Sequence, residues 1–181
     1  MAGKRGLIMG LANDKSIAWG IAQALHSQGA EIAVSYHGAA MEKRVTPLAA
    51  RLDSPLVIEC DASDPASIDA ARDQISAVWD NIDFVVHAIG FSDKSELRGR
   101  YLDTSRDNFL MTMDVSVYSF TSVLQRMEPL LAEGASALTL SYYGAEKVMP
   151  NYNVMGVAKA AREASVMYLA ADLGRKGIRV N

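Results

Sequence analysis

Near its N-terminus the chain reads Leu7-Ile-Met-Gly10-Leu-Ala-Asn-Asp-Lys-Ser16-Ile17-Ala18-Trp-Gly20. A short apolar run that ends in glycine, followed by a serine and an apolar period of helical spacing, predicts a strand, a tight turn and a helix. The free N–H groups at the start of such a helix bind phosphate groups. We therefore expect Gly10 to make the turn, and Ser16 and Ile17 to present N–H groups to a pyrophosphate. Gly20 is expected to allow the helix to approach the strand closely.

This segment has fewer glycines than the usual G-x-G-x-x-G pattern of dinucleotide-binding turns. An ordinary strand, loop and helix with a serine cap is therefore the alternative.

The rest of the chain repeats the same alternation of short apolar runs and longer helical periods. Strands are predicted at residues 7–10, 31–36, 56–60, 82–88 and 136–141, and a sixth begins at Ile178. Helices are predicted at residues 17–28, 41–52, 66–79, 105–131 and 152–175. This alternation predicts an α/β fold, a doubly wound parallel sheet flanked by helices. Ligands of such sheets bind at the carboxyl ends of the strands.

Length and composition restrict the class of protein. The 181 residues, half of them hydrophobic, predict one domain over residues 1–181. A net charge of -3 without a basic block argues against a nucleic-acid partner, and no apolar run is long enough to cross a membrane. The single Cys60 excludes an intrachain disulfide, and the first strand leaves no room for a signal peptide. We expect a cytoplasmic protein, and we predict no metal site.

The second, third and fourth strands each end at a candidate for binding the adenosine or nicotinamide half of a dinucleotide. His37 follows the second strand, Asp61 and Ala62 follow the third, and Gly90 follows the fourth. Asp61 can accept a hydrogen bond from an adenine amino group, with the Ala62 N–H beside it. The alternatives are an exposed loop histidine at 37 and a turn or helix cap at 61. His87, inside the fourth strand, is interpreted as a core histidine.

The second strand lacks the acidic residue that often binds the adenosine ribose in NAD enzymes. Lys43 and Arg44 could pair with a 2′-phosphate, but their setting indicates a solvated helix face. We therefore favour NADH over NADPH.

Tyr152 and Lys159 are seven residues apart, close to two turns of a helix, so both would project from one helix face. A cation favours the ionised phenol and strengthens it as a hydrogen-bond donor to a developing oxyanion. The alternative is a half-buried tyrosine near a lysine that reaches solvent. Tyr142, at the end of the fifth strand, brings a second phenol to the same edge.

The patterns Gly-x5-Ser-x-Ala-x-Gly (residues 10–20) and Tyr-x-x-Met-x-x-x-Lys (residues 152–159) resemble those of the divergent short-chain dehydrogenase/reductases. Within them the chain is similar, from Lys4 to Asn181, to the bacterial NADH-dependent enoyl-acyl-carrier-protein reductases. Ser-Tyr-Tyr-Gly-Ala-Glu at 141–146 and Pro-Asn-Tyr-Asn-Val-Met-Gly at 150–156 carry the closest likeness. The classical branch has its lysine four residues after the tyrosine, where this chain has Gly156, so a classical ketoreductase is disfavoured.

The resemblance implies a Rossmann-type fold and reduction of a trans-2-enoyl thioester by NADH in type II fatty-acid synthesis. Tyr152 would donate to the thioester carbonyl, Lys159 would hold the nicotinamide ribose, and Tyr142 would supply a proton or position the substrate. Ser92 would lie on the substrate side. The implied cofactor-binding residues are Gly10, Ser16, Ile17, His37, Asp61, Ala62, Ile89, Gly90 and Lys159. The implied partners are acyl carrier protein and three further copies in a homotetramer built on helices 105–131 and 152–175.

Members of this family continue beyond the position of Asn181 with the rest of the sixth strand, a substrate-covering segment and a seventh strand. We therefore expect a C-terminally truncated chain. If it ends naturally here, we expect an exposed apolar sheet edge and a half-open cofactor site. The alternative function is then a non-catalytic module that binds NAD(H) or associates with other subunits.

Overall fold

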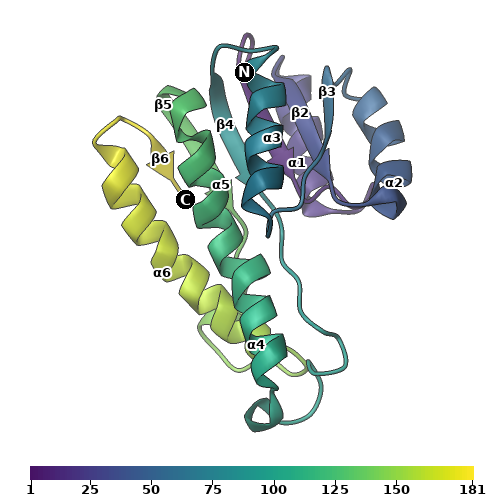
Figure 1. The fold of residues 1–181 in the computed structure, drawn as a ribbon, viewed down its shortest axis with the longest axis vertical. Coiled ribbons are helices and arrows are strands. Elements are labelled where there is room, and N and C mark those ends of the chain that lie inside the picture. Colours follow the sequence, from purple (N-terminus) through teal and green to yellow (C-terminus); the bar gives the residue numbers. More distant parts are fainter.

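A computed structural model describes residues 1–181 as six parallel strands in the order β3-β2-β1-β4-β5-β6, with helices on both faces (Figure 1). The strands are β1 (Arg5–Met9), β2 (Glu31–Tyr36), β3 (Leu56–Glu59), β4 (Ile82–His87), β5 (Leu131–Thr139) and β6 (Arg179–Val180). The chain moves outward from β1 to β3 and then returns to the other side of β1 with β4. This reversal places a topological switch point between β1 and β4, where ligands of such sheets bind. The predicted doubly wound α/β fold is confirmed.

Six α-helices connect the strands. They are α1 (Ile17–Ser27), α2 (Ala39–Ala50), α3 (Pro65–Ser76), α4 (Arg106–Met113), α5 (Ser119–Met127) and α6 (Val154–Gly174). The shorter turns are η1 (Tyr101–Asp103), the π-helical η2 (Asp114–Tyr118), η3 (Glu128–Leu130) and η4 (Tyr143–Ala145). Asp64 caps α3 by accepting a hydrogen bond from the Ala66 N–H, and Pro65 occupies its first position, as expected for residues with these preferences.

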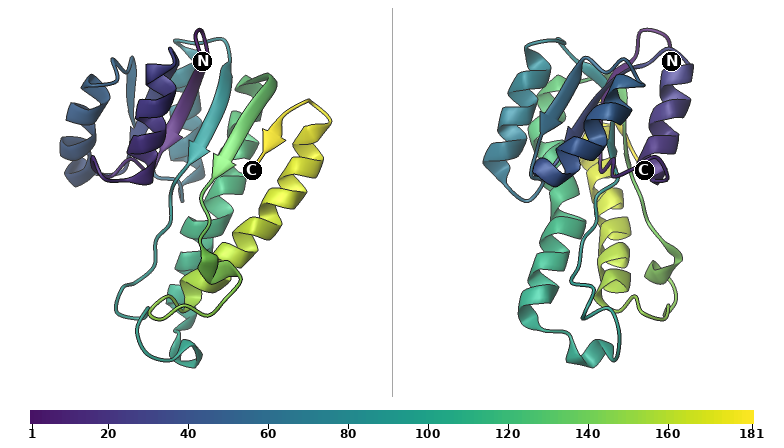
Figure 2. Two further views of the ribbon diagram at one scale, coloured as in Figure 1. Left: turned by 180° about the vertical axis from the view of Figure 1, so that it is seen from behind. Right: turned by 90° about the vertical axis from the view of Figure 1, so that its right-hand side faces the viewer.

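Alternate strand residues point to opposite faces and form two cores. Leu7 and Met9 of β1 belong to the core under α3, α5 and α6, while Ile8 between them belongs to the core under α1 and α2. The inner residues of the central strands, such as residues 32–34 of β2 and 84–86 of β4, are therefore apolar on both faces of the sheet. The views in Figure 2 show the two helical layers and the sheet between them.

The helix α4 and the N-terminal part of α6 extend beyond the carboxyl ends of the strands (Figures 1 and 2). They support the connections that follow β4 and β5, so these connections lie beside the switch point. None of the helices combines the length and the apolar composition required to cross a membrane.

The prediction of one helix over residues 105–131 and of a strand starting at Ser136 is wrong in detail. The helix widens into the π turn η2 and ends near Pro129, which lacks the N–H that a further helical turn requires. The strand β5 begins at Leu131, and its pairing with β4 shifts in register between Ile82 and Phe84.

Two expectations about local geometry are also wrong. Tyr152 precedes α6, because Asn151 and Asn153 adopt the positive φ angles 57° and 36° and the helix begins only at Val154. The two-turn helical relation between Tyr152 and Lys159 therefore does not apply. Gly20 is exposed in α1, and a Cβ added there would meet no atom within 4 Å, so it does not mediate a close approach of helix and strand.

Candidate active site

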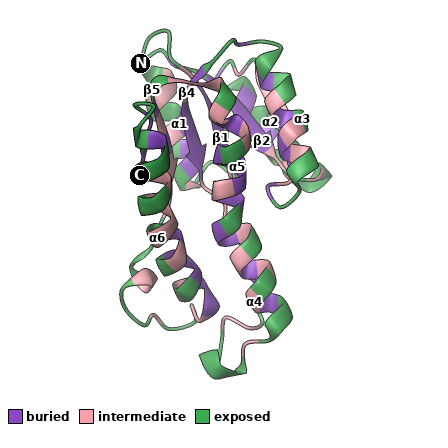
Figure 3. Cartoon of the chain, turned by 60° about the vertical axis from the view of Figure 1, so that its left-hand side comes forward, coloured by how far each residue is buried: buried purple, intermediate pink, exposed green.

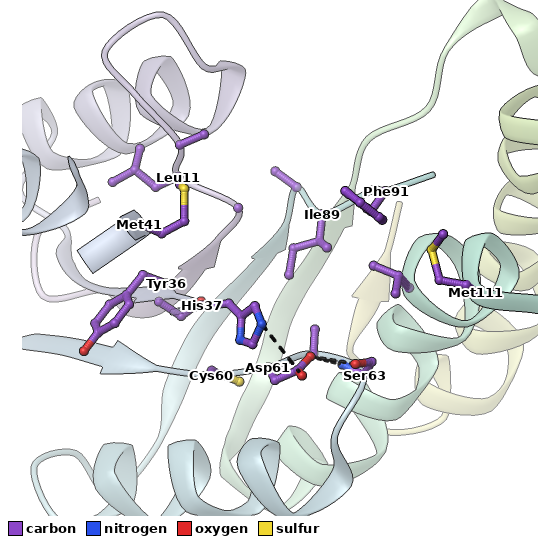
Figure 4. Close-up of a pocket in the computed structure, with 17 residues that line it drawn as sticks. Leu11, Tyr36, His37, Met41, Cys60, Asp61, Ser63, Ile89, Phe91 and Met111 are labelled. Carbon is purple, nitrogen blue, oxygen red and sulfur yellow. Dashed lines mark hydrogen bonds and ion pairs between the residues drawn. The ribbon is translucent and has the colours of Figure 1, made fainter. Parts of the chain in front are cut away.

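A cleft of about 660 Å³ lies at the carboxyl ends of β1 to β4, at the switch point (Figure 4). Its 17 lining residues include 11 hydrophobic ones. Six of the predicted cofactor-binding residues line it: Gly10, His37, Asp61, Ala62, Ile89 and Gly90. Residues predicted at four separate strand ends therefore line one cavity.

Asp61 and His37 face each other on one side of this cleft, as the dashed line in Figure 4 shows. The His37 Nε2 lies 4.0 Å from one carboxylate oxygen of Asp61, and the Ser63 N–H and hydroxyl donate to the other at 2.9 and 2.7 Å. Burial raises the pKa of Asp61, but the Ser63 hydrogen bonds and His37 outweigh it, so the net pKa is lowered. The carboxylate is therefore an acceptor at neutral pH.

Gly10 has to be glycine for two reasons. Its φ is 88°, which L side chains rarely adopt, and an added Cβ would overlap the Ala88 carbonyl group, 2.5 Å from the carbon atom. The backbone of β1 therefore passes directly against the segment that follows β4. This contact brings the first turn of the cleft next to Ile89 and Gly90.

Ser16 and Ile17 lie outside the lining of the cleft. The Ser16 hydroxyl caps α1 by accepting from the Trp19 N–H at 3.3 Å and donates to the Asn13 carbonyl at 2.7 Å. The Ile17 side chain is 68% exposed. The helix cap predicted at Ser16 is therefore confirmed. The contact of the Ser16 and Ile17 N–H groups with a pyrophosphate stays a prediction.

A second cluster, which we call the tyrosine pair, consists of Tyr142 and Tyr152. Their ring centroids are 4.9 Å apart at an interplanar angle of 64°. Gly144 makes room for them, because a Cβ there would lie 2.5 Å from the Tyr152 ring. A Cβ on Gly156 would lie 2.8 Å from the Gly144 carbonyl oxygen, so a lysine at position 156 does not fit this backbone.

The tyrosine pair adjoins the cleft through Met155. The Met155 methyl group lies 3.6 Å from the position of a Cβ on Gly90, and the Ser116 hydroxyl lies 3.7 Å from the Met155 sulfur. Ser116 also exchanges hydrogen bonds with the backbone of Phe91, at 2.9 Å each. The segment after β4 is therefore fixed between the cleft and the start of α6.

The expected effect of a cation on Tyr152 is only partly present. Burial and Tyr142 raise the pKa of Tyr152, and the cation that lowers it, by less, is Arg162. The net pKa is raised, contrary to the expectation of a phenol activated by Lys159. The phenol is therefore protonated at neutral pH and is a hydrogen-bond donor.

Lys159 is buried, and its ammonium donates to the Leu140 carbonyl at 2.7 Å, at the end of β5. Burial and the charge of Arg162 lower its pKa to about 8, and Glu163 opposes this change. Lys159 therefore carries its charge at neutral pH and loses it in mildly alkaline solution.

Ser92 is only 6% exposed and does not line the cleft. Its hydroxyl donates to the Asn108 side-chain oxygen at 3.2 Å and accepts from Thr112 at 2.9 Å. The contact of Ser92 with substrate stays a prediction, while its hydrogen bonds fix the segment after β4 against α4.

Arg162, which is fully buried near Lys159, was not predicted from the sequence as a site residue. The available signal was its place three positions after Lys159 in α6, which puts both on one helix face. An arginine among alanines in an amphipathic helix is ordinarily a surface residue, so the signal was weak.

The comparisons with known proteins agree on one family. The family model described as "Enoyl-(Acyl carrier protein) reductase" matches residues 10–181. The curated "Enoyl-[acyl-carrier-protein] reductase [NADH] 1" of Rhizobium meliloti is 64% identical over 181 residues, which are 100% of this chain and 66% of the relative.

Two solved structures have the same fold. The enoyl-(acyl-carrier-protein) reductase of Anaplasma phagocytophilum, in complex with NAD, is 58% identical with a TM-score of 0.97, over 100% of this chain and 70% of that one. The Bacillus cereus enzyme, with NADP+ and indole naphthyridinone, is 45% identical with a TM-score of 0.97, over 99% of this chain and 71% of that one. The chain thus spans about two thirds of the length of these relatives.

Proposed function

Because the chain belongs to the enoyl-(acyl carrier protein) reductase family, we propose that it reduces the trans-2 double bond of enoyl-acyl-carrier-protein thioesters with NADH, in type II fatty-acid synthesis. Residues 1–181 would form a single dinucleotide-binding domain. The observation that carries the proposal is that Met155 connects the tyrosine pair with Gly90 of the cleft, while the Lys159 ammonium donates to the Leu140 carbonyl directly after β5.

The cleft fits a dinucleotide in shape and in chemistry. Gly10 leaves space that a side chain would fill, Asp61 offers a carboxylate oxygen toward an adenine or ribose donor, and Ile89 and Gly90 form an apolar wall for the nicotinamide. Ser16 and Ile17 would hold the pyrophosphate from the start of α1. We favour NADH, because no lysine or arginine lines the cleft to pair with a 2′-phosphate. Bound NADH would supply the hydride.

Tyr152 is the proposed hydrogen-bond donor to the thioester carbonyl oxygen. Its raised pKa keeps the phenol protonated, so its O–H can stabilise the negative charge that develops on that oxygen. The Tyr142 ring packs against the Tyr152 ring with 4.9 Å between the ring centroids. Tyr142 itself is 46% exposed and can reach solvent, which suits a role in proton supply or in positioning the substrate.

Lys159 is proposed to bind the nicotinamide ribose hydroxyls and to add positive charge to the site. Its ammonium is buried and held by one carbonyl, so further N–H donors of the same group are available for the ribose. The charge is present at neutral pH because the pKa is about 8.

The proposed partners are acyl carrier protein, which presents the substrate, and further copies of the chain in a homotetramer. The helices α4 and α6 and the π turn η2 carry large apolar side chains that face solvent: Leu110, Tyr118, Met167 and Tyr168. Figure 3 shows exposed residues along α4 and α6. Such surfaces support an interface on these helices.

The test is the loss of NADH absorbance with a short enoyl-CoA substrate. Tyr152→Phe should lower kcat by about 10²- to 10³-fold, because the oxyanion loses its donor. Tyr168→Phe is the matched control: it removes a hydroxyl from a tyrosine of α6 that is 75% exposed but keeps the apolar ring, so it should retain full activity. NADH binding measured by calorimetry without any turnover would instead favour the non-catalytic module. Turnover of an acetoacetyl substrate would favour a ketoreductase.

A further inference from the structure

Arg162 is a buried cation without an acidic partner. Its side chain is 0% exposed, and none of the ion pairs of the chain includes it. The neighbouring Glu163 carboxylate instead accepts from the Ser141 hydroxyl. Burial lowers the pKa of Arg162 to about 10, so the guanidinium stays charged at neutral pH. A buried charge is costly unless it is hydrogen-bonded, so its bonding partners explain how it is held.

Neutral oxygen atoms from three parts of the site accept all of its hydrogen bonds. The Ser116 carbonyl accepts from Nε at 2.6 Å and also from Nη2, and the Ile89 carbonyl accepts from Nη2 at 2.7 Å. The Thr139 hydroxyl and the Leu140 carbonyl accept from Nη1 at 3.1 and 3.4 Å. Ser116 lies in the π turn η2, Ile89 lies two residues after β4, Thr139 ends β5, and Leu140 follows it. The guanidinium therefore ties together the backbone on which the cleft and the tyrosine pair are built.

Lys159 and Arg162 share one acceptor. The Lys159 ammonium lies 2.7 Å and the Arg162 Nη1 lies 3.4 Å from the same Leu140 oxygen, so the two cations are close neighbours. Two positive charges at this distance repel each other unless something holds both in place. The fork of hydrogen bonds that fixes Arg162 therefore also fixes the direction of the Lys159 ammonium, and the Arg162 charge reaches the Tyr152 phenol.

We propose that Arg162 is a positioning residue of the reaction, which holds the Leu140 carbonyl that binds Lys159 and places a second positive charge behind the Tyr152 hydroxyl. The proposal rests on the proposed function and deepens it. In mildly alkaline solution Lys159 loses its proton, while Arg162 keeps the site positive. The absence of a carboxylate partner is part of the arrangement, because a nearby negative charge would cancel the field at the phenol.

The first test measures the titration of Lys159 in the protein without NADH or substrate. Reductive methylation with 13C labels the lysines, NMR follows their titration, and Lys159→Arg assigns the signal. The charged and titratable groups that act on Lys159 are Arg162 and Glu163 on its own helix and His87 on β4, and Tyr152 acts on Arg162. We expect a midpoint near pH 8 in the unchanged protein, because burial and the neighbouring Arg162 guanidinium both disfavour the charged ammonium. A midpoint at the ordinary value of 10.5 would overturn the proposal without any variant.

The second test compares Arg162→Gln, which is neutral, with Arg162→Lys, which keeps the charge but not the fork. The midpoint should rise in the glutamine variant and stay near its original value in the lysine variant. With enoyl substrate, kcat should fall about tenfold or more in Arg162→Gln. At high pH, kcat should fall less in Arg162→Lys, because this variant keeps the positive charge. Arg175→Met, an exposed arginine at the end of the same helix, is the control and should change neither quantity.

An Arg162→Gln protein that is folded and shows an unchanged Lys159 midpoint and kcat would leave Arg162 a purely structural residue. If the glutamine variant does not fold, the unchanged protein and the lysine variant still decide the matter through their midpoints. Because the titration uses neither NADH nor substrate, failure of the proposed reductase activity would leave this readout intact, and the two failures are distinguishable.

Discussion

Replacing Gly10 with alanine should destabilise the fold and weaken dinucleotide binding. The φ of 88° costs an L side chain about 1–2 kcal/mol, and the overlap of the new Cβ with the Ala88 carbonyl group adds about 1–3 kcal/mol of overpacking. The free energy of unfolding should therefore fall by about 2–5 kcal/mol, a large part of the stability of an ordinary domain. Any shift that relieves the overlap moves the segment after β4, so NADH affinity should fall as well.

Gly20→Ala is the matched control, because it makes the same chemical change in the same segment of chain. Gly20 lies in α1, and an added Cβ meets nothing within 4 Å, so this variant should gain about 0.5–1 kcal/mol of stability from helix propensity. Urea denaturation, followed by the fluorescence of the buried Trp19 and Trp79, measures both changes. Equal effects of the two substitutions, or a Gly10→Ala protein as stable as the original, would refute the argument from backbone geometry.

Three further predictions concern pH and packing. The pKa of His87 is lowered from 6.5 to about 3, first by burial and then by Arg162, so the unfolded chain binds the proton more tightly. Stability should therefore fall by on the order of 4 kcal/mol as the pH drops from 6.5 to 3, and His87→Gln should reduce this fall in acid titrations monitored by circular dichroism. The pKa of Lys159 is lowered from 10.5 to about 8, so between these pH values the unfolded chain binds more protons than the folded chain. The free energy of unfolding should therefore rise from about pH 8 to 10.5, and urea denaturation of Lys159→Met should lack that rise. Phe120→Ala should cost about 3–5 kcal/mol, because the ring is fully buried and lies 5.3 Å from the His87 ring; an unchanged urea midpoint would contradict this packing.

Most of the fold could be predicted because its signals are local. The apolar runs that become strands are separated by helical periods, and α1 begins where Ser16 indicated, at Ile17. The long helix was harder, because nothing local distinguishes the π turn η2 from an α-helical turn. Its Ser116 carbonyl accepts from Arg162, a residue 46 positions away. Pro129 was a visible signal for the end of the helix that the periodic pattern concealed.

The site was predictable to the extent that it follows strand ends. Gly10, Asp61 and Gly90 meet in one cleft because parallel strands present their carboxyl ends at the same edge. The relation of Tyr152 to Lys159 was predicted from helical spacing, and this reasoning failed because Asn153 adopts a positive φ before the helix begins. The role of Arg162 depends on hydrogen-bond acceptors from three separate segments of the chain, and no local sequence pattern predicts that these acceptors meet.

In the proposed reaction, the tyrosine pair and Lys159 serve hydride transfer to an enoyl thioester. Mass spectrometry of a short trans-2-enoyl thioester, incubated with the protein and NADH, tests it most directly. We expect a saturated product that gains two hydrogen atoms, formed far more slowly by Tyr152→Phe. Recovery of unchanged thioester from a protein that binds NADH, or equal rates for Tyr152→Phe and the unchanged protein, would contradict the account.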